Sequence, residues 1–414
     1  MVRLQRLNYS AQKQQWESRA LNKDKQKGFP ITAWSAVNSL GTNTKEIIKN
    51  LRNGSSRLFD PPEGTPFQAV CGRVDTELPA LSLDLQGYDS RNNRFVQQAI
   101  SEIEPSLRAA LDRWGPKRVG ICVGSSTSAM DELETAYTDQ IQGRKVPSGS
   151  ALFARGSAEG LVHILRELSG FLGPTAVISN ACASSGKAFA SAKRWLDADL
   201  VDAVLVGGAD SLCQTTLRGF RALGLLSDQP SRPFSQDRSG INLGEGSALL
   251  LMERTGEGPR LLGVGESTDA HHMTTPDPEG KGASAAMQAA VRESGLSMID
   301  IDYINAHGTG TRANDIVEAN AIRACVGPRA QPLVASTKGY VGHTLGTAGA
   351  TEAIFVLESL VGGWVPESVG AAPLDPDIHI DVPLKLWQGE IKFALSNSFA
   401  FGGSNISLAF GAPE

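Results

Sequence analysis

The two halves of this chain carry strand, loop and helix patterns in the same order, and this repetition limits the fold more than any other feature. The matched segments are 119–134, 175–196 and 203–212 in the first half and 301–318, 332–360 and 393–405 in the second. The first two of each set run from an apolar, β-rich stretch through small residues into a helical pattern. Such repetition predicts two similar halves related by a pseudo-twofold axis, with one site between them.

The alternation of strands and helices predicts a layered α/β fold with buried sheets. The apolar runs expected to form strands are "KRVGICVG", "TAVISN", "VDAVLVGGAD", "DYINAHG", "PLVAST" and "IKFALSNSFAF". We divide the 414 residues into a basic N-terminal extension (1–28), a first half (29–255) and a second half (256–414). The extension is expected to be a solvated tail or an arm that binds a partner.

Composition excludes several classes of protein. A formal net charge of −5 argues against a nucleic-acid binder, which needs a basic footprint. No stretch approaches the roughly 18 uninterrupted apolar residues of a membrane span, and the N-terminus lacks the apolar core of a signal peptide, so we expect a cytoplasmic protein. The five cysteines are widely spaced and contain no CxxC pair, so neither a disulfide framework nor a metal site is expected.

Cys182 stands where an apolar run gives way to a helical pattern. Phe189, Ala192 and Leu196 fall on one face of that helix. At a helix N-terminus the unpaired N–H groups and the dipole favour a thiolate, which predicts a lowered pKa for Cys182. The alternative is a small buried hydrophobe, and the other four cysteines keep that interpretation.

Two histidines lie in loops rich in glycine and threonine: His307 in "NAHGTGT", and His343 in "STKGYVGHTLGTAGA" together with Lys338. By the repeat, His343 precedes the second helix as Cys182 precedes the first, so a twofold axis would bring them together. A thiol can accept an acyl group, and imidazole donors can stabilise an enolate oxygen. The pair His271 and His272 lacks the third ligand expected of a metal site.

Residues 29–414 resemble the elongating β-ketoacyl-acyl carrier protein synthases, which are condensing enzymes of the thiolase superfamily. The order Cys-His-His distinguishes this group from the priming synthases, which have asparagine in place of the second histidine. The resemblance rests on "ACASS" at Cys182 and on "RPFSQDRSGINLGEGSALLLME" (232–253), "DAHHMTTP" (269–276), "NAHGTGTRANDIVEA" (305–319), "STKGYVGHTLGTAGA" (336–350) and "NSFAFGGSN" (397–405).

The resemblance implies a thiolase-like fold with layers α-β-α-β-α and a set of catalytic roles. Cys182 would carry the acyl chain, and His307 and His343 would bind the malonyl thioester and promote decarboxylation. Lys338 would order the site, paired with Glu318. The N–H groups of Cys182 and Phe401 would form the oxyanion hole.

Further roles follow from the same resemblance. Thr309, Thr311 and Thr274 would contact the pantetheine arm or the malonyl group, and Phe401 would also gate entry. The relatives usually have glycine at the position of Ala400, whose β-carbon is expected to restrict positive φ angles at this hinge. No diffusible cofactor is implied, because phosphopantetheine arrives attached to acyl carrier protein.

The implied reaction is decarboxylative Claisen condensation of an acyl-cysteine with malonyl-acyl carrier protein. The pathway would be fatty-acid elongation or a specialised polyene or polyketide route, such as aryl-polyene synthesis. The implied partners are acyl carrier protein, in its acyl and malonyl forms, and a second subunit in a homodimer or in a heterodimer with a chain-length-factor-like protein. Candidate basic residues for carrier docking are Arg52, Arg57, Arg218 and Arg221.

Two other functions are weighed against this one. A non-catalytic chain-length-factor-like partner would usually lack the nucleophile, which this chain keeps at Cys182. A thiolase would need a second cysteine near the C-terminus, and the sequence has none after Cys325.

Overall fold

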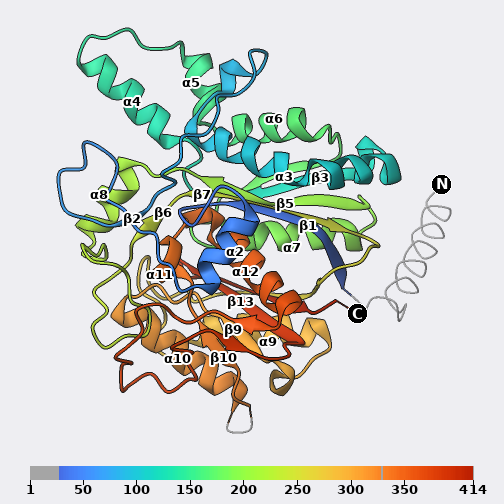
Figure 1. Cartoon of the computed structure of the whole chain (residues 1–414), viewed down its shortest axis with the longest axis vertical. Helices are drawn as coiled ribbons and strands as arrows, with labels where there is room; N and C mark the ends of the chain where they lie inside the picture. The colour runs from blue at the N-terminus through green and yellow to red at the C-terminus, as the bar shows by residue number, and fades with distance from the viewer. Residues whose placement is uncertain (1–27, 328–329, 414) are drawn as a thin grey trace, which may run out of the picture.

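The computed structural model describes residues 28–327 and 330–413 (Figure 1). Apart from Gly28, the basic extension predicted over residues 1–28 lies outside the described residues, so its role stays a prediction.

Two five-stranded sheets contain the same arrangement of strands. In the first half the order is β4 (Thr175–Ile178), β3 (Val119–Gly124), β5 (Ala203–Asp210), β7 (Gly246–Glu253) and β1 (Phe29–Val37). In the second half it is β10 (Leu333–Ala335), β9 (Tyr303–Asn305), β13 (Phe393–Ala400), β14 (Ser404–Gly411) and β8 (Arg260–Thr268). In both sheets the first three strands are parallel and the last two are antiparallel additions. The predicted repeat is therefore present, strand for strand.

The two sheets touch at one end only. Strand β1 pairs with β8 through Phe29 with Leu261 and Pro30 with Arg260, which links the two ladders into one series of ten strands. The predicted division between residues 255 and 256 falls in the turn between β7 and β8.

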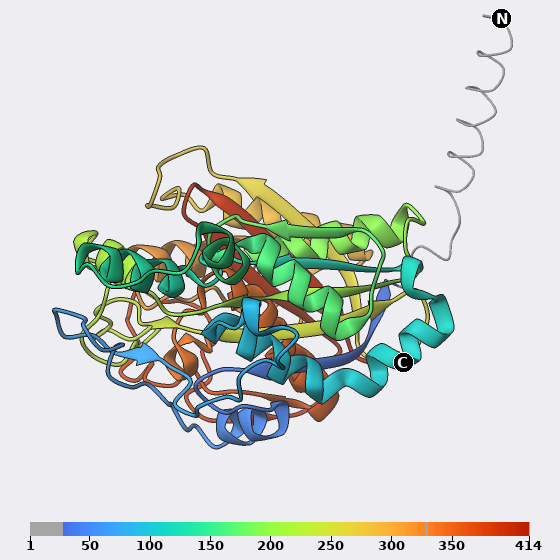
Figure 2. The same ribbon diagram turned by 90° about the horizontal axis from the view of Figure 1, so that it is seen from above.

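Helices form three layers, one outside each sheet and one between them (Figure 1), and Figure 2 looks down onto this stack from above. The outer layer on the first sheet contains α3 (Arg91–Trp114) and α6 (Ala158–Ser169), and the outer layer on the second contains α9 (Lys281–Ser294) and α10 (Arg312–Val326). Between the sheets lie α7 (Ser184–Asp197) and α12 (Ala348–Gly362), which contact each other and strands of both halves. The predicted α-β-α-β-α layering is confirmed.

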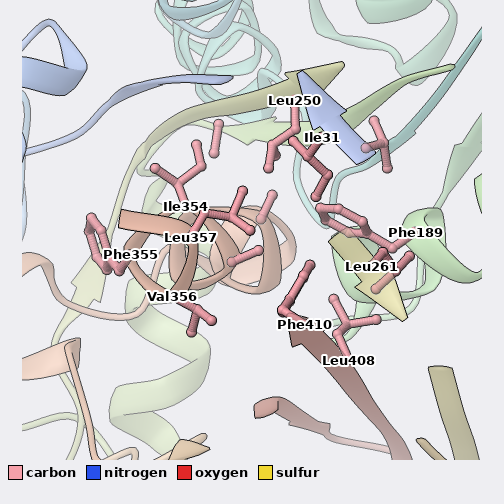
Figure 3. Packing of buried hydrophobic residues seen from close by; sticks show 14 of the residues in the cluster. Ile31, Phe189, Leu250, Leu261, Ile354, Phe355, Val356, Leu357, Leu408 and Phe410 are labelled. Atoms are coloured by element: carbon pink, nitrogen blue, oxygen red, sulfur yellow. The ribbon is translucent and has the colours of Figure 1, made fainter. Parts of the chain in front are cut away.

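The central layer contains the main hydrophobic core (Figure 3). Phe189, Ala192 and Leu196 of α7 are fully buried, as their helical spacing predicts. The segment Leu345–Gly362, which contains α12, has a mean hydropathy of 1.2 and is long enough to cross a membrane, but 83% of it is buried inside the protein. Its apolar composition is thus explained by its place between two sheets, where every face of a helix is covered.

Shorter elements complete the described part of the chain. The remaining α-helices are α2 (Thr44–Arg52), α4 (Met130–Ile141), α5 (Gly149–Gly156), α8 (Gln214–Ala222) and α11 (Lys338–Val341). Two small sheets pair β2 (Cys71–Gly72) with β6 (Leu243–Gly244) and β11 (Trp364–Val365) with β12 (Trp387–Gln388). The 3-10 turns are Gln86–Tyr88, Pro116–Arg118, Met298–Asp300 and Leu345–Thr347.

Candidate active site

A cavity of about 480 Å³ lies between the two halves. Its lining includes Cys182 from the first half and His307, His343 and Phe401 from the second. The prediction of one site between repeated halves is therefore supported by the position of this cavity.

A strained turn presents Cys182 to the cavity. Ala181 has a left-handed backbone, with φ of +44°, which is costly for a residue with a β-carbon. Ser184 stabilises the turn, because its hydroxyl donates to the Ala181 carbonyl (2.6 Å) and accepts from the Asn180 N–H (2.8 Å). Helix α7 begins at Ser184, so Cys182 lies just before its first turn.

The predicted lowering of the Cys182 pKa is wrong. Burial raises the pKa of the thiol from 9.0 to about 11. The Lys338 charge and the backbone N–H groups of Phe401 and Cys182 oppose this rise without cancelling it. Only 6% of Cys182 is exposed, so the loss of hydration outweighs the favourable helix end.

Cys182, His307 and His343 converge. The sulfur and one nitrogen of each ring all lie within 4.8 Å of one another. The imidazole centroids are 5.4 Å apart and the ring planes are nearly perpendicular, at 83°. The two histidines thus face one reaction volume next to the sulfur.

Hydrogen bonds of the main chain fix both histidines. The Glu318 carboxylate accepts from the N–H groups of His307 (2.7 Å) and Gly308 (2.8 Å). His343 lies in a short parallel bridge, in which its N–H donates to the Asn242 carbonyl (2.7 Å) and its carbonyl accepts from the Gly244 N–H (2.8 Å). These contacts leave the imidazoles themselves available for substrate.

Both imidazoles are neutral at pH 7. Burial first, and then the positive charge of Lys338, hold the pKa of His307 and of His343 well below 6.5. Within the described residues, neither ring nitrogen of His343 nor Nδ1 of His307 has a hydrogen-bond partner. Buried polar atoms of this kind are usually satisfied, so these nitrogens are suited to bind a ligand.

Lys338 forms its ion pair with Glu352 of α12, and not with Glu318 as predicted. The two side chains are 2% and 4% exposed and are in direct contact. Glu318 instead supports the His307 loop. Burial raises the pKa of Glu318 to about 7, while the N–H groups of Gly308 and His307 favour its charged form.

The expectation for Ala400 is also corrected. Ala400 is the last residue of β13 and has no positive φ; the left-handed residues of this segment are Gly402 (φ +84°) and Gly403 (φ +74°). The hinge therefore keeps glycine where the conformation demands it, and the β-carbon of Ala400 causes no strain in this state.

The three predicted substrate-binding threonines all line the cavity. The hydroxyls of Thr309 and Thr311 are 3.0 Å apart, and the Thr274 N–H donates to Nδ1 of His272 (3.2 Å). Their positions allow them to contact a substrate arm that enters the cavity.

Sequence reasoning missed two buried carboxylates near the site. Glu352 is an acid in the otherwise apolar stretch "AGATEAIFVLESL", which is a signal that could have identified it. Asp210, at the end of β5, accepts hydrogen bonds from the loop Ser125–Ser128 and from Thr347. It thus connects the first half to the residue that precedes α12.

Among the described residues that line the cavity, Cys182 is the one cysteine. Cys325 lies on α10, where its thiol contacts the Ser284 carbonyl at 3.6 Å. A thiolase mechanism, which needs a second thiol beside the first, therefore gains no support from the site.

Comparisons with known proteins agree with this geometry. The family descriptions "Beta-ketoacyl synthase, N-terminal domain" and "Beta-ketoacyl synthase, C-terminal domain" match residues 29–257 and 260–372. Nodulation protein E of Rhizobium meliloti (strain 1021) is 33% identical, over 92% of this chain and 98% of that protein. The 3-oxoacyl-[acyl-carrier-protein] synthase 2 of Mycobacterium leprae (strain TN) is 30% identical, over 93% of this chain and 97% of that protein.

Solved structures show the same likeness. A ketosynthase in complex with its chain length factor, from Xenorhabdus doucetiae, has a TM-score of 0.86 and 37% identity, over 93% of this chain and 98% of that one. The ishigamide ketosynthase/chain length factor has a TM-score of 0.83 and 27% identity, over 93% and 99%. This chain belongs to the beta-ketoacyl synthase family, whose members are condensing enzymes of the acyltransferase class with the thiolase fold.

Proposed function

We propose that this β-ketoacyl-acyl carrier protein synthase condenses an acyl group held on Cys182 with malonyl-acyl carrier protein. The observation that carries the proposal is the convergence of one thiol and two neutral imidazoles in a cavity between the halves.

In the first half-reaction the acyl group moves from the pantetheine sulfur to the sulfur of Cys182. The thiol is protonated at neutral pH, so its proton must leave as the new thioester forms; a neutral imidazole within 4.8 Å can accept it and return it to the departing pantetheine sulfur. The N–H groups of Cys182 and Phe401 would stabilise the oxyanion of the tetrahedral intermediate.

In the second half-reaction His307 and His343 each donate one N–H to the carbonyl oxygen of the malonyl thioester. The bond to the carboxylate breaks, carbon dioxide leaves, and the electron pair of that bond forms an enolate whose oxygen accepts from the two N–H donors. The enolate carbon attacks the acyl carbonyl, the bond to the Cys182 sulfur breaks, and the departing thiolate takes up one proton from solvent. Neutral histidines suit this role, because each keeps one N–H donor.

Lys338 would act on His307 and His343 through its positive charge. Its charge disfavours protonation of both imidazoles and favours negative charge on the substrate. This mechanism uses no diffusible cofactor, since phosphopantetheine is delivered by the carrier. The proposal includes a cytoplasmic location, with which the five free cysteines are consistent.

The proposed first partner is acyl carrier protein. Of the four candidate arginines, Arg218 and Arg221 are exposed on α8, whose Phe220 lines the cavity. Arg52 stacks over Trp364 and Arg57 lies near Glu46, and neither lines the cavity. We therefore place the docking surface for the acidic carrier on α8.

The proposed second partner is a chain-length-factor-like subunit, with a homodimer as the alternative. The support is the 37% identity to a ketosynthase that was solved with its chain length factor. The same likeness favours a specialised polyene or polyketide pathway over primary fatty-acid elongation. Since this chain keeps Cys182, His307 and His343, it would be the catalytic member of the pair.

The test is incubation of the purified protein, alone and with such a subunit, with acyl- and malonyl-acyl carrier protein. Mass spectrometry should detect 3-oxoacyl-acyl carrier protein and release of carbon dioxide. Absence of product under both conditions, with carrier proteins that serve a reference synthase, would contradict the proposal.

A further inference from the structure

Phe401 has an aromatic partner that the proposed mechanism does not use. The ring of Phe220 stacks on the ring of Phe401, with centroids 5.5 Å apart and 23° between the planes. Phe220 belongs to α8 in the first half, whereas Phe401 follows β13 in the second, and both line the cavity. The stack therefore connects the two halves at the site.

The helix that carries Phe220 is firmly anchored. Its N-cap residue, Cys213, provides no side-chain cap; instead the Glu134 carboxylate of α4 accepts from the N–H groups of Gln214 (2.8 Å) and Thr215 (2.5 Å). A carboxylate at this end of a helix satisfies otherwise unpaired donors and interacts favourably with the dipole. In addition, Leu217 is fully buried, so α8 presents Phe220 from a fixed position.

The segment that carries Phe401 is held through its main chain on one side. Gly402 and Gly403 follow Phe401 with positive φ angles; a β-carbon built on Gly402 would meet nothing within 4 Å, whereas one on Gly403 would lie 3.0 Å from Cβ of Asp269. The Gly402 N–H donates to the Met273 carbonyl (2.7 Å), and the Gly403 carbonyl accepts from the Asp269 N–H (2.8 Å). These bonds fix the backbone after Phe401, while the described ring contact of Phe401 on the side of the first half is the stack with Phe220.

We propose that Phe220 is a positioning residue for Phe401. By stacking, its ring holds Phe401 in the orientation found here, in which the Phe401 N–H lies near enough to the sulfur of Cys182 to favour negative charge there, as an oxyanion-hole donor must. This inference rests on the gate and oxyanion roles proposed for Phe401 above.

The test replaces the ring without removing its apolar bulk. In Phe220→Leu we expect kcat for condensation to fall by about 2- to 12-fold, the range expected for loss of one aromatic pair, with an unchanged KM for malonyl-acyl carrier protein. Alkylation of Cys182 by iodoacetamide should become faster, because the gate spends more time away from the sulfur. Phe220→Tyr, which keeps the ring, should restore both values.

A matched control is Phe67→Leu. The ring of Phe67 contacts the same helix, since its centroid lies 5.6 Å from Cζ of Arg221. Phe67 does not line the cavity, so this variant should behave as wild type. An unchanged kcat and alkylation rate in folded Phe220→Leu, or equal effects in Phe67→Leu, would overturn the inference.

Phe401→Leu separates failure of this inference from failure of the proposed function. If Phe401→Leu condenses at the wild-type rate, the proposed gate itself is wrong. If Phe401→Leu is impaired, the effects of Phe220→Leu and Phe401→Leu should not add in the double variant, because both remove the same stack. Additive effects would overturn the role of Phe220 and leave the proposed function intact.

Discussion

Replacement of Lys338 by methionine should destabilise the protein in a way that depends on pH. Burial raises the pKa of Glu352 from 4.5 to about 7 in the folded protein, even with Lys338 beside it. Because the folded state binds this proton more tightly than the unfolded state, wild-type stability is lost as pH rises from 4.5 and this loss stops near 7. Without the Lys338 charge the folded pKa of Glu352 must rise further, so the loss continues above pH 7.

The magnitude follows from the linkage relation. Each pH unit between the wild-type and the variant pKa of Glu352 costs about 1.4 kcal/mol of unfolding free energy. The stability difference between wild type and Lys338→Met should therefore contain a constant part and a part that opens above pH 7 and grows by about 1.4 kcal/mol per pH unit until the pKa of Glu352 in the variant is reached.

Urea unfolding followed by circular dichroism, from pH 6 to pH 9, would measure this difference. The double variant Lys338→Met/Glu352→Leu is the matched control, because it has no carboxylate at this position and should lose the pH-dependent part. A constant difference between wild type and Lys338→Met across this range would refute the assignment of Glu352 as the partner of Lys338.

Four other predictions concern the site. The rate of Cys182 alkylation should rise about tenfold per pH unit between pH 7 and 9, because the pKa of the thiol is about 11; a plateau below pH 8 would show that the thiol is activated at rest. His307→Ala and His343→Ala should accept an acyl group but lose at least about 100-fold in condensation, since each removes one donor to the enolate; near wild-type product formation by either would exclude that role. Glu318→Gln should lose about 1–3 kcal/mol of unfolding free energy, because its amide can satisfy only one of two backbone N–H groups, and unchanged urea unfolding would contradict the described contact. Binding of acyl carrier protein, measured by fluorescence anisotropy, should weaken with salt and in Arg218→Glu but not in Arg52→Glu; equal effects of the two substitutions would place the docking surface elsewhere.

The parallel strands and the meeting of Cys182 with two histidines could be predicted from sequence. The six expected strands correspond to β3, β4, β5, β9, β10 and β13, and their repeated order placed Cys182 and His343 at equivalent positions; the place of His307 beside them was implied by the family resemblance. Strands β1, β7, β8 and β14, the antiparallel additions to the two sheets, were not among the expected strands, although Ile406, Leu408 and Phe410 of β14 occupy every second position.

Two features of the site depend on contacts that sequence spacing does not reveal. Glu318 and Glu352 are both buried acids on helices, and only the packing of α12 against α11 decides which of them Lys338 contacts. The pKa of Cys182 depends first on its burial in the folded protein, so its local position before α7 could not predict the sign of the shift.

The most direct test of the condensing site is mass spectrometry of His307→Ala, as intact protein and as proteolytic peptides, after exposure to acyl-acyl carrier protein and then to malonyl-acyl carrier protein. The acyl mass should be found on the peptide that contains Cys182, should persist after malonyl addition, and should disappear under the same conditions in wild type. An acyl group attached to another residue, or one cleared by the variant as fast as by wild type, would contradict the claim that these residues form one condensing site.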